Sequence, residues 1–138
     1  ELTPSIVGAV DDTTTPILIQ RFYDRGIYPD WWKLEPFTTQ SAWSHAVAAI
    51  ERNDPRTRGI VILGLDAAPD ALAKSFALAA KQPLVKGFTV GRTIFGEAAR
   101  QWMSGQIDDT AAVRTMAANY QSLCHVWDSA RNAMGDAV

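Results

Sequence analysis

The sequence predicts an α/β fold made of parallel βα units, and specifically the later half of a (β/α)8 barrel. Short apolar stretches alternate three times with stretches of helical periodicity, which is the order of a parallel sheet with right-handed crossovers. The connections are short. An open doubly wound sheet fits the same order. A whole barrel takes roughly 250 residues, so 138 residues correspond to about half of one, from the end of strand five through helix eight.

The elements at either end of the repeating units are helices. Residues 16–26, "PILIQRFYDRG", follow a polar loop and predict the first helix. Residues 108–134 form the longest amphipathic pattern in the chain, with two aspartates placed favourably at its start. The chain begins at "ELTPS" without a methionine. This start predicts a fragment or a processed product, and with the length we expect residues 1–138 to be the second half of one domain whose upstream half is absent.

The first βα unit starts at "DWWKLEPF", residues 30–37, a short apolar strand that carries a lysine. Residues 38–53 then show apolar side chains at helical spacing, with Thr39 or Ser41 as the expected N-cap. The sequence "DPRTRG" ends this helix.

The second and third units repeat this order. Residues 59–65, "GIVILGL", are almost uninterruptedly apolar, which is typical of a strand buried on both faces. A helix is predicted over residues 70–82, a strand over 85–92, and a further helix over 93–105 that Gly105 ends.

Composition limits the possible partners. The chain is 47% hydrophobic and 20% charged, with a net charge of −2, so no basic face predicts binding to nucleic acid or an anionic membrane. No apolar run approaches the roughly 18 residues that span a bilayer. The single cysteine, Cys124, excludes an internal disulfide and fits a reducing compartment. We expect a cytoplasmic protein.

Lys33 is the first candidate for chemistry. Strand alternation places Trp31, Lys33 and Glu35 on one face, and Trp32 and Leu34 on the other. In a barrel, Lys33 and Glu35 would point inward near the carboxyl ends of the strands, where active sites lie. A desolvated lysine attacks ketones and forms a Schiff base. Glu35 would either transfer protons or hold Lys33 charged in an ion pair, and a solvated lysine at the strand end is the structural alternative.

Glycines at two successive strand ends predict a phosphate site. Gly64 and Leu65 lie at the end of one predicted strand, and Gly91 and Arg92 lie at the end of the next. Glycine allows backbone N–H groups to approach a ligand, and barrels commonly bind phosphate after their last two strands. Arg92 offers a fork for phosphate oxygens. Ordinary turn glycines beside a solvated arginine explain the pattern equally well.

Metal chemistry has little support. His45 and His125 lie in predicted helices, and no ligand spacing such as HxH or CxxC occurs. We expect both histidines to be helix-surface or packing residues, with no metal and no other cofactor. Trp43, Trp102 and Trp127 occupy helical positions that predict packing in the core.

Three stretches resemble a known family: "YPDWWKLEPF", "RGIVILGLDAAPD" and "VKGFTVGRTIFGEAARQW". They are similar to the aldolase-like domain fused to the C-terminus of bacterial 5-dehydro-2-deoxygluconokinases of inositol catabolism, over nearly the whole chain. More distantly, "WWKLEP" is similar to the Schiff-base lysine motif of class I tagatose-bisphosphate aldolases, which are (β/α)8 barrels. The proline stands one place early in that motif.

The resemblance implies a class I aldolase that cleaves 5-dehydro-2-deoxygluconate 6-phosphate into dihydroxyacetone phosphate and malonate semialdehyde. It places Lys33 at the Schiff-base position, and Gly64, Gly91 and Arg92 at the phosphate. "ELTPS" is similar to the strand that carries an active-site glutamate, which would be Glu1. The implied partners are the phosphorylated keto-sugar acid and the fused sugar kinase. A further catalytic lysine and the first half of the barrel do not occur in this chain.

Three alternatives stand beside the aldolase. The domain would be a sugar-phosphate sensor that regulates the attached kinase, a metal-dependent aldolase with its ligands in the missing half, or an assembly module without activity. The exposed sheet edges of a half-barrel are liable to pair with another chain, so we expect the chain to form homo-oligomers or aggregate.

Overall fold

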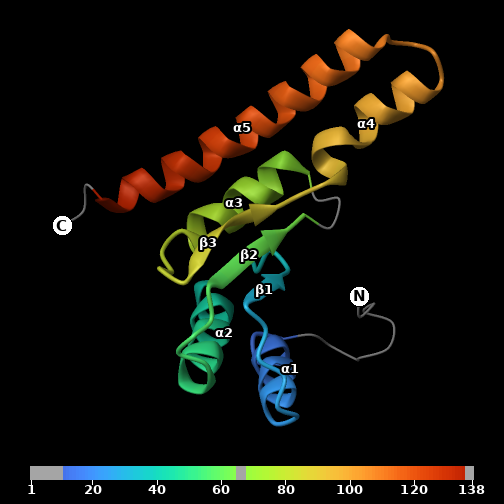
Figure 1. The fold of residues 1–138 in the computed structure, drawn as a ribbon. Helices are drawn as coiled ribbons and strands as arrows, with labels where there is room; N and C mark the ends of the chain where they lie inside the picture. The colour runs from blue at the N-terminus through green and yellow to red at the C-terminus, as the bar shows by residue number, and fades with distance from the viewer. Residues whose placement is uncertain (1–10, 65–67, 136–138) are drawn as a thin grey trace.

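A computed structural model describes residues 11–64 and 68–135 of the chain (Figure 1). Within them, helices and strands alternate along most of the chain, and two helices end it. The elements are α1 (Thr14–Tyr23), β1 (Trp31–Leu34), α2 (Gln40–Asn53), β2 (Gly59–Leu63), α3 (Pro69–Ala79), β3 (Val85–Thr89), α4 (Arg92–Met103) and α5 (Asp109–Gly135).

The three strands form one parallel sheet in the order β1-β2-β3, so neighbours in the sheet are also neighbours along the chain. Trp32 pairs with Ile60, and Ile60 pairs with Val85. The register between β2 and β3 shifts by one residue after Ile60. The α/β class and the three parallel units are therefore confirmed. The sheet in the described residues has three strands, whereas a closed (β/α)8 barrel has eight.

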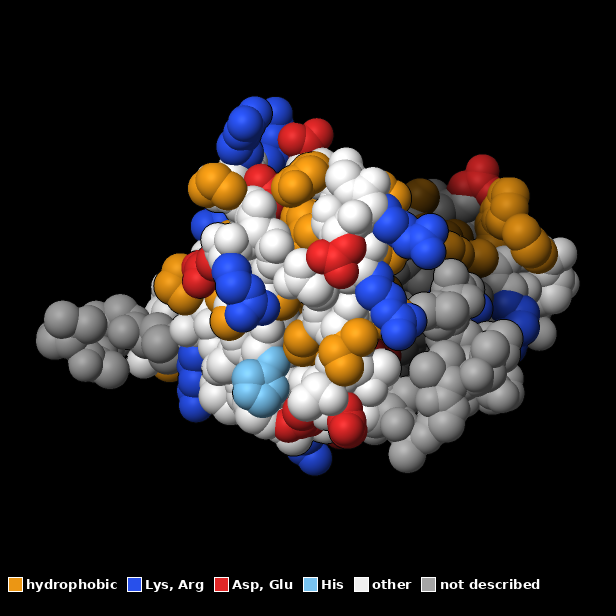
Figure 2. Space-filling model, turned by 90° about the horizontal axis from the view of Figure 1, so that it is seen from below, with side chains coloured by type: hydrophobic (Ala, Val, Ile, Leu, Met, Phe, Trp, Pro, Cys, Tyr) orange, Lys and Arg blue, Asp and Glu red, His pale blue; other side chains and the backbone are white. Residues whose placement is uncertain are grey.

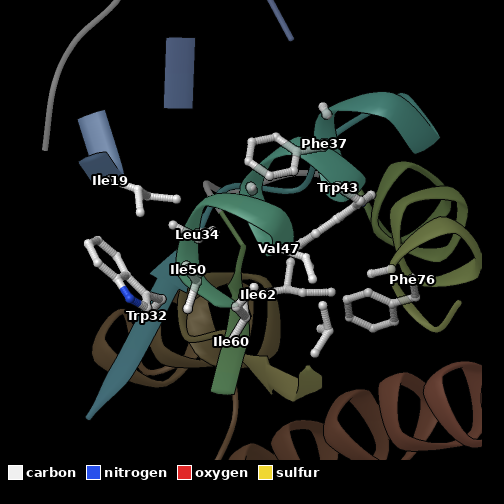
Figure 3. Close-up of a cluster of buried hydrophobic side chains, with 14 of the residues drawn as sticks. Ile19, Trp32, Leu34, Phe37, Trp43, Val47, Ile50, Ile60, Ile62 and Phe76 are labelled. Atoms are coloured by element: carbon white, nitrogen blue, oxygen red, sulfur yellow. The ribbon is translucent and has the colours of Figure 1, made fainter. Parts of the chain in front are cut away.

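The core lies on one face of the sheet. The alternate strand residues Trp32, Leu34, Ile60 and Ile62 are at most 8% exposed, and they meet apolar side chains from α1, α2 and α3 (Figure 3). In Figure 3 the rings of Phe37, Trp43 and Phe76 close this cluster. Right-handed crossovers between strands that are added in one direction all place their helices on the same face of the sheet. The single covered face agrees with this rule.

Local signals set the helix ends: Thr39 and Gly105 act as predicted, whereas α3 begins at Pro69, one residue before its predicted start. Thr39 is the N-cap of α2, and its hydroxyl accepts a hydrogen bond from the backbone N–H of Ala42 at 3.1 Å. Pro69 begins α3, where a missing N–H costs nothing. Gly105 follows α4 with a φ of 72°, the left-handed conformation that suits glycine after a helix.

The last two helices form a hairpin. α4 packs against α5, and the carboxyl-terminal part of α5 packs against α3 (Figure 1). Arg131 of α5 donates hydrogen bonds to the carbonyls of Ala80, Gln82 and Val85 at 2.8, 3.5 and 2.7 Å. This single side chain therefore joins the end of α3 and the start of β3 to α5.

One expected core residue lies elsewhere. Trp43 and Trp127 are buried as predicted, but Trp102 is 48% exposed. Its indole N–H donates to Asp109 Oδ1 at 2.6 Å, across the turn between α4 and α5. The prediction for Trp102 was wrong because the helical spacing does not show which face of α4 meets α5.

Candidate active site at the carboxyl ends of the strands

The second face of the sheet carries Lys33. In the register of the sheet, Lys33 lies opposite Val61, and Val61 lies opposite Gly87. Lys33 is exposed and Val61 and Gly87 are half-buried, whereas the residues before and after Lys33 on β1 are buried in the core. No helix of the described residues contributes to a core on this side. Lys33 thus lies on an exposed face of the sheet, beside the half-buried residues Val61 and Gly87.

The amine of Lys33 makes no hydrogen bond or ion pair to the part of the chain that the structure describes. The ion pair with Glu35, one of the two roles considered for that carboxylate, is not formed. Desolvation, which favours a neutral and nucleophilic amine, would have to come from groups that cover the open face.

Glu35 lies one residue beyond the end of β1, so strand alternation does not fix the direction of its side chain. Its Oε1 accepts a hydrogen bond from the Thr15 hydroxyl at 3.3 Å. Thr15 lies in the first turn of α1 and is twenty positions away in the sequence, which is why sequence patterns did not reveal this partner. The half-buried carboxylate is therefore held at the carboxyl edge of the sheet by α1.

The two predicted glycine turns come together. A Cβ placed on Gly64 would lie 2.8 Å from Val90 Cγ1 and 3.5 Å from Thr93 Oγ1. The chain after β2 therefore touches the turn between β3 and α4, and a side chain at position 64 would push this turn away. The close approach explains the glycine at this position by packing, without requiring a ligand.

Gly91 is the N-cap of α4, and its carbonyl accepts hydrogen bonds from the N–H groups of Ile94 and Phe95 at 2.8 and 3.2 Å. Arg92 is the first residue of α4 and is exposed. A helix N-terminus favours anions, so this edge suits a phosphate group. Two predicted site residues, Glu1 and Leu65, lie outside the described residues.

Strand geometry gives the scale of the site. Lys33 is two strands away from β3, which is roughly 10 Å across the sheet. The glycine turns lie about three residues nearer the carboxyl edge, roughly another 10 Å along the strands. A lysine side chain together with a short phosphorylated substrate bridges such a distance.

A polar cluster that sequence patterns did not reveal lies at the start of α2. Asp12 Oδ2 accepts hydrogen bonds from the hydroxyls of Ser41 and Thr39. The bond from Ser41 is the main reason that the pKa of Asp12 is lowered, followed by the bond from Thr39. The partners of Asp12 lie almost thirty positions away, beyond the reach of local motifs.

The histidines lie on helix surfaces as expected, since His45 and His125 are both exposed. The described residues contain no group of three or more His, Cys, Asp or Glu side chains placed to hold a metal ion. No helix among them is both long enough and apolar enough to cross a bilayer.

Comparison with known proteins gives a family. Residues 1–131 match DUF2090, described as an uncharacterized protein conserved in bacteria. The chain belongs to the DUF2090 family. No curated protein and no solved structure matches it. Membership of DUF2090 supplies no activity, so the aldolase, the fused kinase and the site residues stay predictions that depend on the geometry above and on the resemblance of the sequence.

Proposed function

We propose that this DUF2090 chain is the later half of a (β/α)8 barrel, and that the intact barrel is a class I aldolase. The observation that carries the proposal is the position of Lys33. It lies on the helix-free face of a parallel sheet, one residue before the carboxyl end of β1. In barrels this face is the interior, and catalytic groups come from the carboxyl ends of the strands.

The sheet supports a barrel more than a doubly wound fold. Doubly wound sheets carry helices on both faces because the strand order reverses. Here the order β1-β2-β3 does not reverse, and the described helices contribute to a single core on one face. Further strands beside the free edges of β1 and β3 would close the sheet around Lys33 and remove it from water.

The proposed reaction follows from a neutral Lys33 amine. The amine attacks the C5 ketone of 5-dehydro-2-deoxygluconate 6-phosphate, and loss of water gives an iminium ion. A base then takes the proton of the C3 hydroxyl, and the C3–C4 bond breaks. Malonate semialdehyde leaves, while the electron pair moves into an enamine on Lys33. Protonation at C4 and hydrolysis release dihydroxyacetone phosphate and the free amine.

Two further groups complete this scheme. Glu35, which Thr15 holds at the same edge, or Glu1 would transfer the protons. The turns at Gly64, Leu65 and Gly91, with Arg92, would bind the phosphate. The substrate would thus lie across the open face, from Lys33 to the start of α4.

Reductive trapping tests this proposal. The intact protein is incubated with the keto-sugar acid phosphate and borohydride, and the labelled peptide is identified by mass spectrometry. We expect a label on Lys33 and loss of cleavage in Lys33→Met, whereas Lys74→Met, which removes an exposed lysine of α3, keeps both. Full activity of Lys33→Met would overturn the mechanism.

A second candidate function is a sugar-phosphate sensor that regulates an attached kinase. The start of α4 at Gly91 and Arg92 favours it, because a helix N-terminus attracts an anion without any contribution from Lys33. Equilibrium binding of the sugar phosphate that persists in Lys33→Met, with no cleavage by the wild type, would support the sensor over the enzyme.

We also propose that the isolated chain self-associates. The outer edges of β1 and β3 are unpaired in the described residues, and Trp31 is 46% exposed beside Lys33 on the open face. Such edges recruit further strands. Sedimentation velocity should show dimers or larger species whose fraction rises with concentration, and a monomer throughout would contradict the expectation.

A further inference from the structure

A groove lies between α1 and α2, on the helices rather than on the sheet. Its volume is about 400 Å³, within the roughly 300–1,000 Å³ of small-molecule sites. Pro16 and Ile17 form its wall on α1, and Ala48 forms the wall on α2. Ile17 is 51% exposed. Figure 2 views the molecule from the side of these two helices and shows hydrophobic side chains set among both cationic and acidic ones.

Most polar groups that line the groove already have partners. The Gln20 side-chain amide bonds to Asp24 and to Asn53. The Thr13 hydroxyl donates to the Asp11 carboxylate at 2.7 Å. These groups fix the geometry of the groove and leave little capacity for a ligand.

His45 is also partly engaged. It lies close enough to Asp12 that its charge helps to lower the pKa of that carboxylate, after the larger effects of the Ser41 and Thr39 hydroxyls. The end of the groove near the start of α2 therefore has the Asp12 carboxylate beside His45, although Asp12 itself does not line the groove. This carboxylate makes that end a poor place for an anionic ligand.

Arg52 is different. It lies in the last turn of α2, it is exposed, and it has no ion pair or hydrogen bond with the described residues. A cation at this position stabilises the helix through its dipole, and that role needs no ligand. However, no carboxylate lines the groove, so its one uncompensated charge is positive and lies beside an apolar wall.

We propose that the α1–α2 groove binds a small amphipathic organic anion, with its acidic group on Arg52 and its apolar body between Ile17 and Ala48. Arg52 and Ala48 are four residues apart, about one helical turn or roughly 6 Å, which fits an aromatic ring or a branched chain that carries one carboxylate or sulfonate. An acidic peptide fits less well, because it would need several cations along the groove. The site is independent of Lys33 and of the aldolase.

Anilinonaphthalene sulfonate is a suitable probe because it joins an aromatic body to one anionic group. The chain is titrated with it, with fluorescence as the readout, and nitrogen-15 NMR spectra locate the binding. We expect the largest shifts at the amides of Ile17 and Ala48. Arg52→Gln should weaken binding about tenfold, the loss of one charge-assisted contact.

Two controls make the result decisive. Arg114→Gln removes an exposed arginine of α5 and should leave the affinity unchanged. Phenylnaphthylamine, which has the rings without the sulfonate, should bind wild type and Arg52→Gln equally weakly. Shifts centred on the open sheet face or on α4, equal affinity for the charged and neutral probes, or tighter binding of a glutamate-rich peptide would overturn the proposal.

Discussion

The two faces of the same strands differ sharply. On β1, Trp32 is 8% exposed and Trp31 is 46% exposed, although they are adjacent in the sequence and identical in chemistry. On β2, Ile62 is fully buried, and Val61 beside it is only half-buried. The covered face determines how the helices pack, while the open face places Lys33 where a ligand or a further part of the proposed barrel can reach it.

The largest expected effect is a difference in the free energy of unfolding between substitutions on the two faces of the sheet. Ile62→Ala removes fully buried methyl groups and should lower the free energy of unfolding by about 2–5 kcal/mol. Val61→Ala, on the open face, should cost less than about 1 kcal/mol. Urea unfolding followed by circular dichroism measures both. If Val61→Ala were as costly as Ile62→Ala, the open face would be covered in solution.

A second comparison concerns the stability contributed by two arginines of α5, Arg131, which is hydrogen-bonded, and Arg114, which is exposed. Arg131→Met removes hydrogen bonds to three carbonyls and the contact of the guanidinium with the Trp127 ring at 5.4 Å. We expect a loss of about 1.5–3 kcal/mol, as for hydrogen bonds that involve a charged group.

The matched control is Arg114→Met, on the exposed surface of the same helix. It should change stability by less than about 0.5 kcal/mol. If both variants unfolded at the same urea concentration, the link between α5 and the turn after α3 would carry no stability.

A smaller effect tests whether the open face is covered in the intact protein. Trp31→Phe should change the stability of the isolated chain by less than about 0.5 kcal/mol. It should also remove part of the tryptophan fluorescence that acrylamide quenches. In the intact barrel the same substitution should leave quenching unchanged, because Trp31 would face the interior. Equal quenching of Trp31 in both proteins would argue against closure of the sheet.

The smallest expected effect is on the stability of the fold at low pH. The pKa of Asp12 is lowered from 3.8, first by the hydrogen bond from Ser41 and then by that from Thr39. A carboxylate with a depressed pKa in the folded state stabilises the fold above its unfolded value, and this stability is lost as pH falls from about 4 through the lower folded pKa.

Asp12→Asn should therefore lose less stability between pH 4 and pH 2 than the wild type. Thermal unfolding across this range measures the difference. Asp128→Asn, which removes an exposed carboxylate of α5, serves as the control. A pH profile of Asp12→Asn that matched the wild type would show that this carboxylate contributes nothing in acid.

The sequence predicted the parallel βα order, the N-cap Thr39 and the buried positions Trp32 and Leu34, because each depends on local periodicity or on a short capping motif. The partners of Glu35 and Asp12 were not predictable in this way, since both carboxylates bond to hydroxyls at least twenty positions away. The exposure of Trp102 was missed for a related reason: the position of α4 depends on its contact with α5.

In the candidate site, too, local features were predictable from the sequence and long-range contacts were not. The glycines at the strand ends were recognisable, and the structure does bring Gly64 against the turn that precedes Gly91. The sequence left open whether Glu35 forms an ion pair with Lys33. In the structure Glu35 instead accepts a hydrogen bond from Thr15, a contact that only the three-dimensional fold reveals.

The order of strands also bears on how the chain is assembled. Because β1, β2 and β3 lie in the sheet in the order in which they are synthesised, each of these three units can dock on the one made just before it. Folding can then proceed stepwise as the chain leaves the ribosome. Arg131 lies after all three strands in the sequence, so its hydrogen bonds would fasten the end of α3 and the start of β3 only after α5 has been made.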